Sequence, residues 1–363
     1  MKLGDLLGTL DSVAPLRFAE GWDNVGLLAG DRGAAMERVL LTIDLTLPVV
    51  EEAQALRCDL VIAYHPPIFE GLKRIDARSP VGQALRHGIA LYSPHTALDA
   101  ALGGTNDVLA DMAGLLSRAP LRPVRPVTEG YKLVTFVPEE HLNAVARAVW
   151  DAGGGRIGDY GQCSFRHPGE GTFHGDEGAN PAVGEAGRLE TVKEVRLEIL
   201  VPEARISGAL AALRAAHPYE EPAVDFFPTN RVEPAPIGMG RIGPVVPVDR
   251  SSFVGQMKEK LGVSHVLVAG PLEGVVRKVA VAAGAAGDLL QAALRQGADV
   301  LVTGEVRHHD ALAAAAAGMT VVCARHSCSE RRALLPYRDR LAERAPQVSF
   351  FVSEVDADPF HFL

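Results

Sequence analysis

The sequence has few cysteines, no long apolar run and no excess of basic residues. Its four cysteines show no framework spacing, which argues against a disulfide-stapled secreted fold and favours reduced thiols. No stretch reaches the roughly eighteen apolar residues of a transmembrane helix. The first residues also lack the apolar core of a signal peptide. We therefore expect a cytoplasmic protein without a membrane partner.

The formal net charge of -9 argues against a nucleic-acid partner, because binding a phosphate backbone requires a basic face. A local basic patch inside an assembly stays open. Hydrophobic residues make up 47% of the chain and charged residues 22%, which is typical of globular proteins. With 363 residues, the chain is long enough for two or three domains with cores of their own.

The two outer parts of the sequence alternate strand-like and helix-like segments. Short apolar runs recur at 39–43, 60–63, 89–92, 279–282, 300–302 and 320–323. Segments with helical spacing separate them, and such alternation is typical of parallel strands joined by crossover helices. We expect residues 1–126 and 233–363 to form the two halves of one discontinuous, three-layer-type α/β domain.

The middle of the sequence, residues 127–232, follows a proline-rich stretch and has a different order. It reads as strand 132–137, helix 138–152, a glycine-rich hairpin, strand 194–201, helix 207–216 and strand 223–227. Strand, helix, two strands, helix, strand is the split βαβ, or ferredoxin-like, order. We therefore expect an inserted α+β domain between the two halves.

Histidines and carboxylates follow three of the expected strands. His65 comes directly after the second run, His95 and Asp99 follow the third, and His326 and Glu330 follow the last. Residues four apart share a helix face. Imidazole with carboxylate is a ligand set for Zn, Mn, Fe and Co, and one carboxylate can bridge two metals. The sequence thus predicts a metal site where strands end.

Each candidate also has a purely structural interpretation. A histidine at a strand end often only forms a hydrogen bond, Asp99 would stabilise a helix N-terminus, and Glu330 would pair with Arg331 or Arg332 on a solvated face. His309 either acts as a general acid or base near the metals or is an exposed histidine at a helix start. These alternatives stay open on spacing alone.

Two further segments each have a functional and a structural interpretation. Residues 284–287, between a strand and a helix, would offer N–H groups to a phosphate or form a plain turn. Residues 217–221 would line a small-molecule or metal pocket, or form a turn locked by two prolines.

Six segments, at 21–27, 64–69, 92–99, 103–107, 304–310 and 326–330, carry a distinctive series of motifs. Together they resemble the GTP cyclohydrolase I type 2 / NIF-three-like family of dinuclear-metal proteins. Segments at 158–163, 171–173 and 217–222 resemble landmarks of the PII/CutA-like domain found in the longer members. The resemblance implies a toroidal homohexamer with two metals per subunit facing an internal cavity.

The same resemblance implies that His65, Asp99, His326 and Glu330 are metal ligands, with Glu330 as the bridge. The family has a pair of adjacent histidines, and Tyr64 stands at the first position of that pair. A phenolate can bind Fe(III), but with a pKa of about 10 it is a poor zinc ligand. We therefore expect one or two divalent cations per chain, either Zn or Fe/Mn. His95 either substitutes as a ligand or orients Asp99.

Two functions follow. The first is a metal-dependent hydrolase, in which Glu330 holds the metals, His309 moves protons and activated water attacks a nucleotide-like substrate. The alternative is a non-catalytic hexameric scaffold, metal carrier or regulator, whose insert senses a small molecule or nucleotide. The loss of a histidine at Tyr64 favours the alternative slightly.

Overall fold

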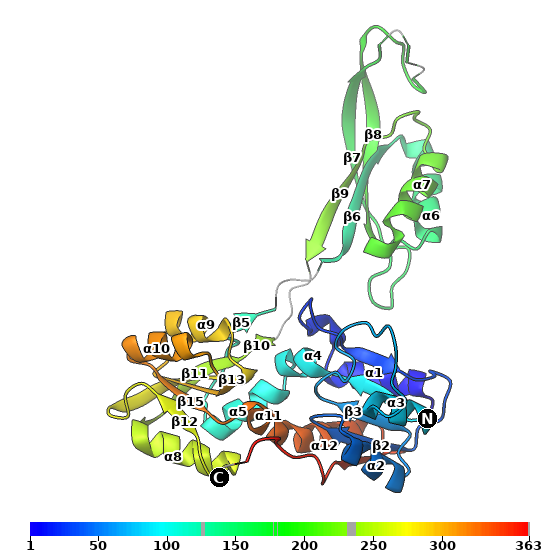
Figure 1. Ribbon diagram of the computed structural model, residues 1–363. Helices are drawn as coiled ribbons and strands as arrows, with labels where there is room; N and C mark the ends of the chain where they lie inside the picture. The colour runs from blue at the N-terminus through cyan, green and yellow to red at the C-terminus, as the bar shows by residue number, and fades with distance from the viewer. Residues whose placement is uncertain (125–127, 177, 180, 231–236, 362–363) are drawn as a thin grey trace. The chain divides into compact units, whose positions relative to one another are not determined.

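The computed structural model describes residues 1–124, 128–176, 178–179, 181–230 and 237–361. The chain divides into two compact units (Figure 1). Unit 1 comprises residues 1–124 and 234–363, and unit 2 comprises residues 125–233. Both are mixtures of helices and strands, so the chain has an α/β structure with several sheets. In the described part of the chain, no helix is long and apolar enough to cross a bilayer.

The first sheet of unit 1 has the strand order β1-β4-β3-β2-β16. Its strands are β1 (Gly26–Ala29), β2 (Arg38–Thr42), β3 (Leu60–Ala63), β4 (Ala90–Ser93) and β16 (Ser349–Val352). All neighbouring strands are parallel except β1, which pairs with β4 in the antiparallel sense. The last strand of the chain therefore completes a sheet made otherwise of the first hundred residues.

Helices cover both faces of this sheet. α1 (Leu3–Val13) and α12 (Leu334–Arg344) pack on one face, and α2 (Leu47–Ala55) and α3 (Pro80–Arg86) pack on the other. The spacing of Leu3, Leu6 and Leu10 places all three on one side of α1, where they are fully buried. Every residue of β3 and β4 is buried, as expected of parallel strands covered on both faces.

The second sheet of unit 1 has the order β11-β13-β14-β15-β12. Its strands are β11 (Arg241–Asp249), β12 (Leu267–Ala269), β13 (Val275–Ala285), β14 (Val300–Glu305) and β15 (Thr320–Cys323). The three central strands are parallel, and the two edge strands are antiparallel to them. β13 extends several residues beyond the predicted run 279–282 at both ends.

The second sheet is also covered on both faces. α5 (Thr105–Ala113) and α8 (Arg250–Leu261) pack on one face, while α9 (Leu289–Arg295) and α10 (His308–Ala316) pack on the other. Short 3-10 helices lie at Leu16–Phe18, Glu139–His141, Glu203–Arg205 and Arg331–Ala333. A two-residue ladder joins β5 (Arg122–Pro123) to β10 (Gly238–Met239).

A buried arginine joins the two halves of unit 1. Arg241, the first residue of β11, is 1% exposed, and its Nε donates to Oδ1 of Asp107 at 2.5 Å. Its Nη1 donates to the carbonyls of Gly238 and Gly240, and its Nη2 donates to two carbonyls at the end of α4 (His95–Ala100). One guanidinium therefore satisfies several backbone carbonyls around a buried carboxylate.

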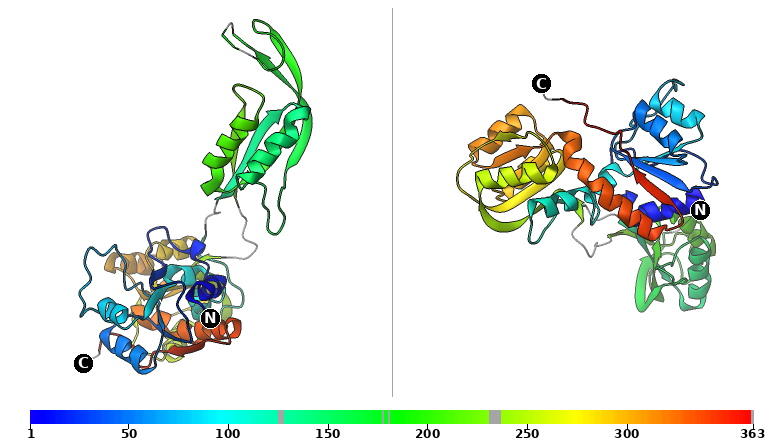
Figure 2. Two further views of the ribbon diagram at one scale, coloured as in Figure 1. Left: turned by 90° about the vertical axis from the view of Figure 1, so that its right-hand side faces the viewer. Right: turned by 90° about the horizontal axis from the view of Figure 1, so that it is seen from below.

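Unit 2 is a four-stranded antiparallel sheet with the order β7-β8-β6-β9. Its elements are β6 (Thr128–Val137), α6 (Leu142–Asp151), β7 (Phe165–His174), β8 (Leu189–Val201), α7 (Ile206–Ala216) and β9 (Val224–Asn230). α6 and α7 lie together on one face of the sheet (Figure 2). The order of strands and helices is that of a split βαβ unit.

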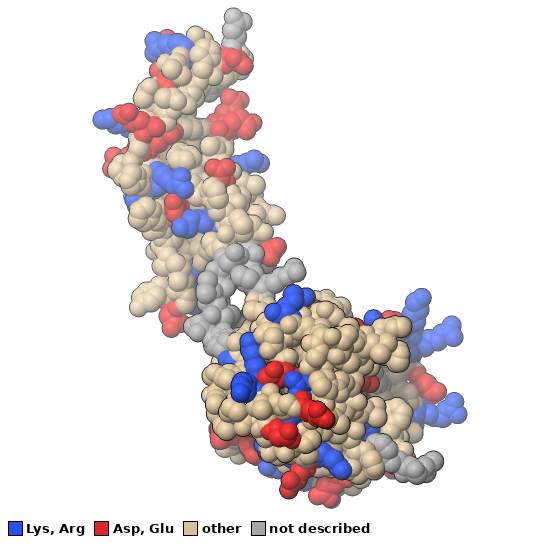
Figure 3. Space-filling model, turned by 90° about the vertical axis from the view of Figure 1, so that its left-hand side faces the viewer, with Lys and Arg blue, Asp and Glu red and all other residues tan. Residues whose placement is uncertain are grey.

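On the face of unit 1 seen in Figure 3, acidic and basic side chains are interspersed.

Candidate metal centre

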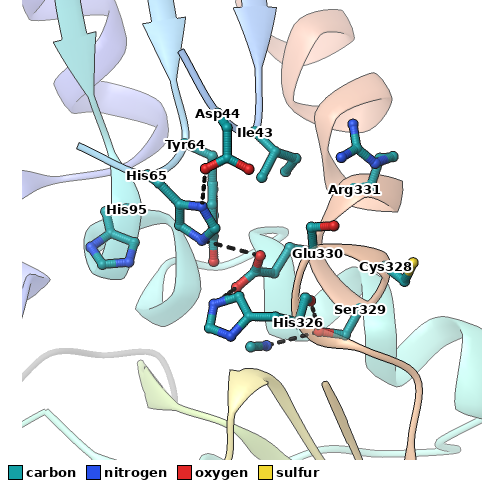
Figure 4. A network of polar contacts seen from close by, with 12 residues as sticks. Ile43, Asp44, Tyr64, His65, His95, His326, Cys328, Ser329, Glu330 and Arg331 are labelled. Atoms are coloured by element: carbon teal, nitrogen blue, oxygen red, sulfur yellow. Dashed lines mark hydrogen bonds and ion pairs between the residues drawn. The ribbon is translucent and has the colours of Figure 1, made fainter. Parts of the chain in front are cut away.

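The predicted site residues follow the carboxyl ends of strands, where α/β proteins build their sites. Tyr64 and His65 follow β3, and His95 opens α4 directly after β4. His326 and Glu330 are the first and last residues of α11 (His326–Glu330), which follows β15 of the second sheet. Figure 4 shows His65 and His326 with their rings directed toward the Glu330 carboxylate.

His65, His326 and Glu330 form a compact triad of donor atoms. Nε2 of His65 lies 3.3 Å from Oε2 of Glu330, and Nε2 of His326 lies 3.3 Å from its Oε1. One donor atom from each of the three residues lies within 4.8 Å of the others. The Glu330 side chain is 3% exposed, so its charge is shielded from water. Two imidazoles and a carboxylate around one point form a ligand set for a divalent metal.

Two atoms of the triad are buried without a hydrogen bond. Nε2 of His65 and Oε2 of Glu330 face each other, yet neither makes a hydrogen bond within the described part of the chain. Buried polar atoms are normally satisfied, and those that are not call for an explanation such as an ion. These atoms fit a cation placed between them.

Each histidine of the triad has a second carboxylate behind it. Oδ1 of Asp44 lies 2.9 Å from Nδ1 of His65, and Oε1 of Glu305 lies 3.1 Å from Nδ1 of His326. Since a carboxylate only accepts, each ring donates its Nδ1 proton to the carboxylate behind it. Both Nε2 atoms then point at the triad, where a bound cation would take the place of a proton, as in carboxylate–histidine–metal arrangements.

The charges of this site favour a cation. Burial alone would lower the pKa of His65, but its hydrogen bond to Asp44, its close approach to Glu330 and the charges of both carboxylates raise it to about 10. The hydrogen bond with His65 in turn lowers the pKa of Asp44, against the opposing effect of burial. The carboxylates thus stabilise positive charge at His65, whether it is carried by a proton or by a metal.

Tyr64 and Asp99 form a buried pair beside the triad. The Tyr64 hydroxyl donates to Oδ1 of Asp99 at 2.5 Å, and both side chains are almost fully buried. Burial, with the charges of Asp99 and Glu330, raises the pKa of Tyr64 well above its usual value, so the phenol keeps its proton. Burial also raises the pKa of Asp99, to about 6, against the opposing effect of the Tyr64 hydrogen bond.

His95 lies next to the triad but is held by another carboxylate. Its Nδ1 lies 2.8 Å from Oδ1 of Asp23, and its ring centroid lies 5.6 Å from that of His65. Its backbone φ of +27° is unusual for a residue with a Cβ. The second Asp23 oxygen accepts from the Thr96 N–H at 3.2 Å, which fixes the start of α4. Asp23 therefore orients His95.

Six predicted metal ligands thus fall into two groups. The structure brings His65, His326 and Glu330 together, while Asp99 and His95 do not join this set of His and carboxylate donor atoms within 4.8 Å, and the Tyr64 hydroxyl is bonded to Asp99. Their roles as ligands stay predictions, as does the role of His309. That side chain is exposed at the start of α10, and its ring packs against His308 at 5.5 Å.

Sequence reasoning missed Asp23, Asp44 and Glu305. Asp44 directly follows the first apolar run, 39–43, and Asp23 and Glu305 lie inside the motifs at 21–27 and 304–310. A carboxylate at a strand end or within a motif was therefore the signal that could have identified them. The sequence alone does not show which histidine ring each of these three carboxylates contacts.

Two glycines allow α11 to approach the second sheet. A Cβ on Gly284, whose φ is +65°, would lie 2.5 Å from Oε1 of Glu330, and a Cβ on Gly304 would lie 2.8 Å from the His326 Cα. The Gly284 N–H donates to the Ser329 hydroxyl at 2.8 Å. That N–H and the N–H of Ala286, which donates to the Glu305 carbonyl at 3.1 Å, are engaged within the protein, which supports the interpretation of residues 284–287 as a structural turn.

A cavity of about 460 Å³ adjoins the triad. Its lining includes His65, His326, Asp44 and Glu305, and its apolar wall contains Leu267, Val268, Val306, Pro359 and Phe360. A space of this size accommodates a small organic molecule.

Unit 2 has a cavity of its own, of about 560 Å³. Phe136, Phe173, Tyr219, Glu170 and Glu194 contribute to its lining. His217 lies behind Tyr219, donating from Nε2 to the Phe136 carbonyl and accepting at Nδ1 from the Tyr219 N–H. Both ring nitrogens of His217 are thus used in holding the 217–222 segment.

Comparisons with known proteins show the family to which this chain belongs. The family model for Duf34/NIF3 (NGG1p interacting factor 3) matches residues 1–359. A Halalkalibacterium halodurans protein called GTP cyclohydrolase 1 type 2 homolog is 37% identical over 359 residues, covering 96% of each chain.

Solved structures show the same likeness. A Bacillus cereus protein related to NIF3 is 34% identical, with a TM-score of 0.69 over 100% of this chain and 99% of that one. A Staphylococcus aureus protein is 28% identical, with a TM-score of 0.80 over the same shares of the two chains. On these matches, the chain belongs to the Duf34/NIF3 family.

Proposed function

We propose that this chain binds one divalent cation through His65, His326 and Glu330 and uses it for hydrolysis. One observation carries the proposal: the Nε2 atoms of His65 and His326 both face the Glu330 carboxylate, while a second carboxylate holds the Nδ1 atom of each ring. Zn, Fe and Mn all accept such ligands. A bound divalent cation would supply Lewis-acid chemistry and make hydroxide available near neutral pH.

The residues around the triad have separate tasks in this proposal. Asp44 and Glu305 hold the Nδ1 protons and so keep the two rings oriented. Asp99 is the predicted ligand for a second cation, and the Tyr64 hydroxyl already donates a hydrogen bond to one of its two oxygens. We therefore expect about one cation per chain rather than two.

A nucleotide-like substrate is suggested by the name of the curated relatives, GTP cyclohydrolase 1 type 2 homolog. The cavity beside the triad has a largely apolar wall, which suits a purine or another flat ring. Arg325 is the one Lys or Arg among the described residues that line it, and Asp358 already binds that side chain. These features support contact with the ring of a nucleotide more than with its phosphates.

A non-catalytic role is the second candidate. The protein would be a metal-dependent scaffold, carrier or regulator, and unit 2 would be a PII/CutA-like sensor of a small molecule. The split βαβ order of unit 2 and its cavity beside Tyr219 support this role. The hydrogen bond from Tyr64 to Asp99 also supports the non-catalytic role, because it occupies a residue that a two-metal site would need as a ligand.

Elemental mass spectrometry on protein purified without a histidine tag tests the cation. We expect about one equivalent in the wild type and a large loss in Glu330→Gln, because that change removes the one anionic ligand of the triad. Glu354→Gln, at an exposed carboxylate, is the matched control. Metal-free wild-type protein that stays metal-free when zinc is supplied would refute the site, and two equivalents would refute the expected stoichiometry.

Hydrolysis is tested separately on the metal-loaded protein with a panel of nucleosides and nucleotides. The hydrolase proposal expects turnover that Glu330→Gln abolishes and Glu354→Gln preserves. If metal binds in the expected amount and no compound turns over, the scaffold or carrier role is favoured.

A further inference from the structure

The residue before the metal ligand His326 has a strained backbone. Arg325 has φ +74° and ψ 152°, a region that glycine occupies readily and that residues with a Cβ avoid. Such a conformation persists only where the surroundings hold it in place. What holds Arg325 therefore also sets the direction in which α11 starts.

A segment near the end of the chain holds Arg325 through its guanidinium. Nη1 of Arg325 donates to Oδ1 of Asp358 at 3.0 Å and to the Phe360 carbonyl at 2.8 Å. The other Asp358 oxygen accepts from the Ser327 hydroxyl at 2.9 Å and from the Cys328 thiol at 3.4 Å. One carboxylate thus binds residues on both sides of His326.

The same segment is anchored at a second point. Oδ2 of Asp356, whose side chain is 1% exposed, accepts from the Ile43 N–H at 2.7 Å and from Nη1 of Arg331 at 2.5 Å. Ile43 precedes Asp44, the carboxylate behind His65, and Arg331 follows Glu330. The segment therefore spans both ligand-bearing parts of the triad.

The segment also borders the cavity beside the triad. Asp358, Pro359 and Phe360 belong to its lining together with His65 and His326. Phe360 is exposed, so its ring is available to a molecule in that cavity.

We propose that residues 356–360 form a strap that positions His326 for metal binding by holding Arg325, and that this strap is one wall of the ligand cavity. The inference rests on the proposed metal site. Asp358 and Arg325 are positioning residues, since they act through His326 and not on the metal. A strap that only stabilised the fold would leave metal affinity unchanged in variants that still fold.

The test measures zinc affinity by competition with a chromophoric chelator, together with the visible spectrum of Co²⁺-loaded protein. We expect Asp358→Asn and Arg325→Ala to weaken zinc binding about 10- to 100-fold and to alter the Co²⁺ spectrum, as loss of outer partners does at other metal sites. Arg325→Lys, which keeps a cation for Asp358, should recover part of the affinity. Glu354→Gln should match the wild type.

Arg325→Gly keeps the test decisive if another variant fails to fold. Glycine accepts the backbone conformation of Arg325, so this variant should fold, yet it loses the guanidinium contacts to the strap and should still bind zinc more weakly than the wild type. If the folded variants bind zinc within about twofold of the wild type, the positioning role of the strap is refuted and the proposed metal site is not. A wild type that binds no zinc would overturn the metal site and the strap with it.

Discussion

By the family resemblance, Tyr64 stands at the position of a second histidine, and we propose that an imidazole there would add a metal ligand. The Tyr64 hydroxyl instead donates a hydrogen bond to Asp99, and burial keeps the phenol protonated. We therefore propose that this single residue decides whether Asp99 serves as a hydrogen-bond acceptor or is available to a cation.

Replacing this residue tests that choice. Tyr64→His should raise the metal content from about one to about two equivalents per chain, because it restores a nitrogen ligand and releases Asp99. Tyr64→Phe is the control, since it releases Asp99 without adding a ligand and should leave the content near one. Equal metal content in Tyr64→His and the wild type, by elemental mass spectrometry, would show that Tyr64 does not govern a second site.

Gly284 is a second decisive residue, because a side chain there would collide with Glu330. In Gly284→Ala the new Cβ would lie 2.5 Å from Oε1 of Glu330, so the carboxylate must move and zinc affinity should fall at least about tenfold. Gly287→Ala is a matched control: its φ of +52° is equally left-handed, but no atom lies within 4 Å of the added Cβ. Equal zinc affinities in the two variants would contradict the role of Gly284.

The triad residues could be predicted because each follows an apolar run that is recognisable as a strand. Their partners could not, because a carboxylate such as Asp44 or Glu305 acquires its role only when two strand ends or a helix and a strand end meet in space. The bond between Tyr64 and Asp99 is likewise invisible in sequence, where a tyrosine in place of a histidine signals only a missing ligand.

Among the elements, α4 and α5 are held against β11 by Arg241. Its guanidinium pairs with the buried Asp107 and caps carbonyls at the end of α4, the helix that carries His95 and Asp99. The position of that helix beside the triad therefore depends on a buried ion pair.

Removing this arginine should destabilise unit 1 strongly. Arg241→Met removes the guanidinium that compensates the negative charge of the buried Asp107 carboxylate. We therefore expect the free energy of unfolding to fall by about 3–5 kcal/mol. Urea denaturation measures this effect. The double variant Arg241→Met/Asp107→Leu should recover part of the loss, because no uncompensated charge stays buried. A loss below about 1 kcal/mol in the single variant would contradict this account.

The central strands of both sheets of unit 1 were predictable from their apolar runs, whereas the edge strands were not. β1, β12 and β16 are three or four residues long and lie at sheet edges. Edge strands lack the full burial that makes a central strand recognisable, and β16 finds its partner β2 about three hundred residues earlier in the chain. Their pairing is decided by packing rather than by local pattern.

At the scale of the whole molecule, the family resemblance predicts six chains in a ring. Native mass spectrometry should then find a particle of about 231 kDa, six times the chain mass of 38.5 kDa. Light scattering after gel filtration is the check in solution. A stable monomer or dimer at micromolar concentration would refute the hexamer while leaving the triad of a single chain unaffected.

The ladder between β5 and β10 has a consequence for how this chain could have arisen. It pairs Pro123 with Gly238, so the chain leaves and rejoins unit 1 at adjacent points. A tight turn can close two antiparallel strands at such a place. One genetic insertion or deletion could therefore add or remove the middle third of the gene in a single event. Every triad residue and every strap residue lies outside that third, so a lineage could gain or lose the module while keeping the candidate metal site unchanged.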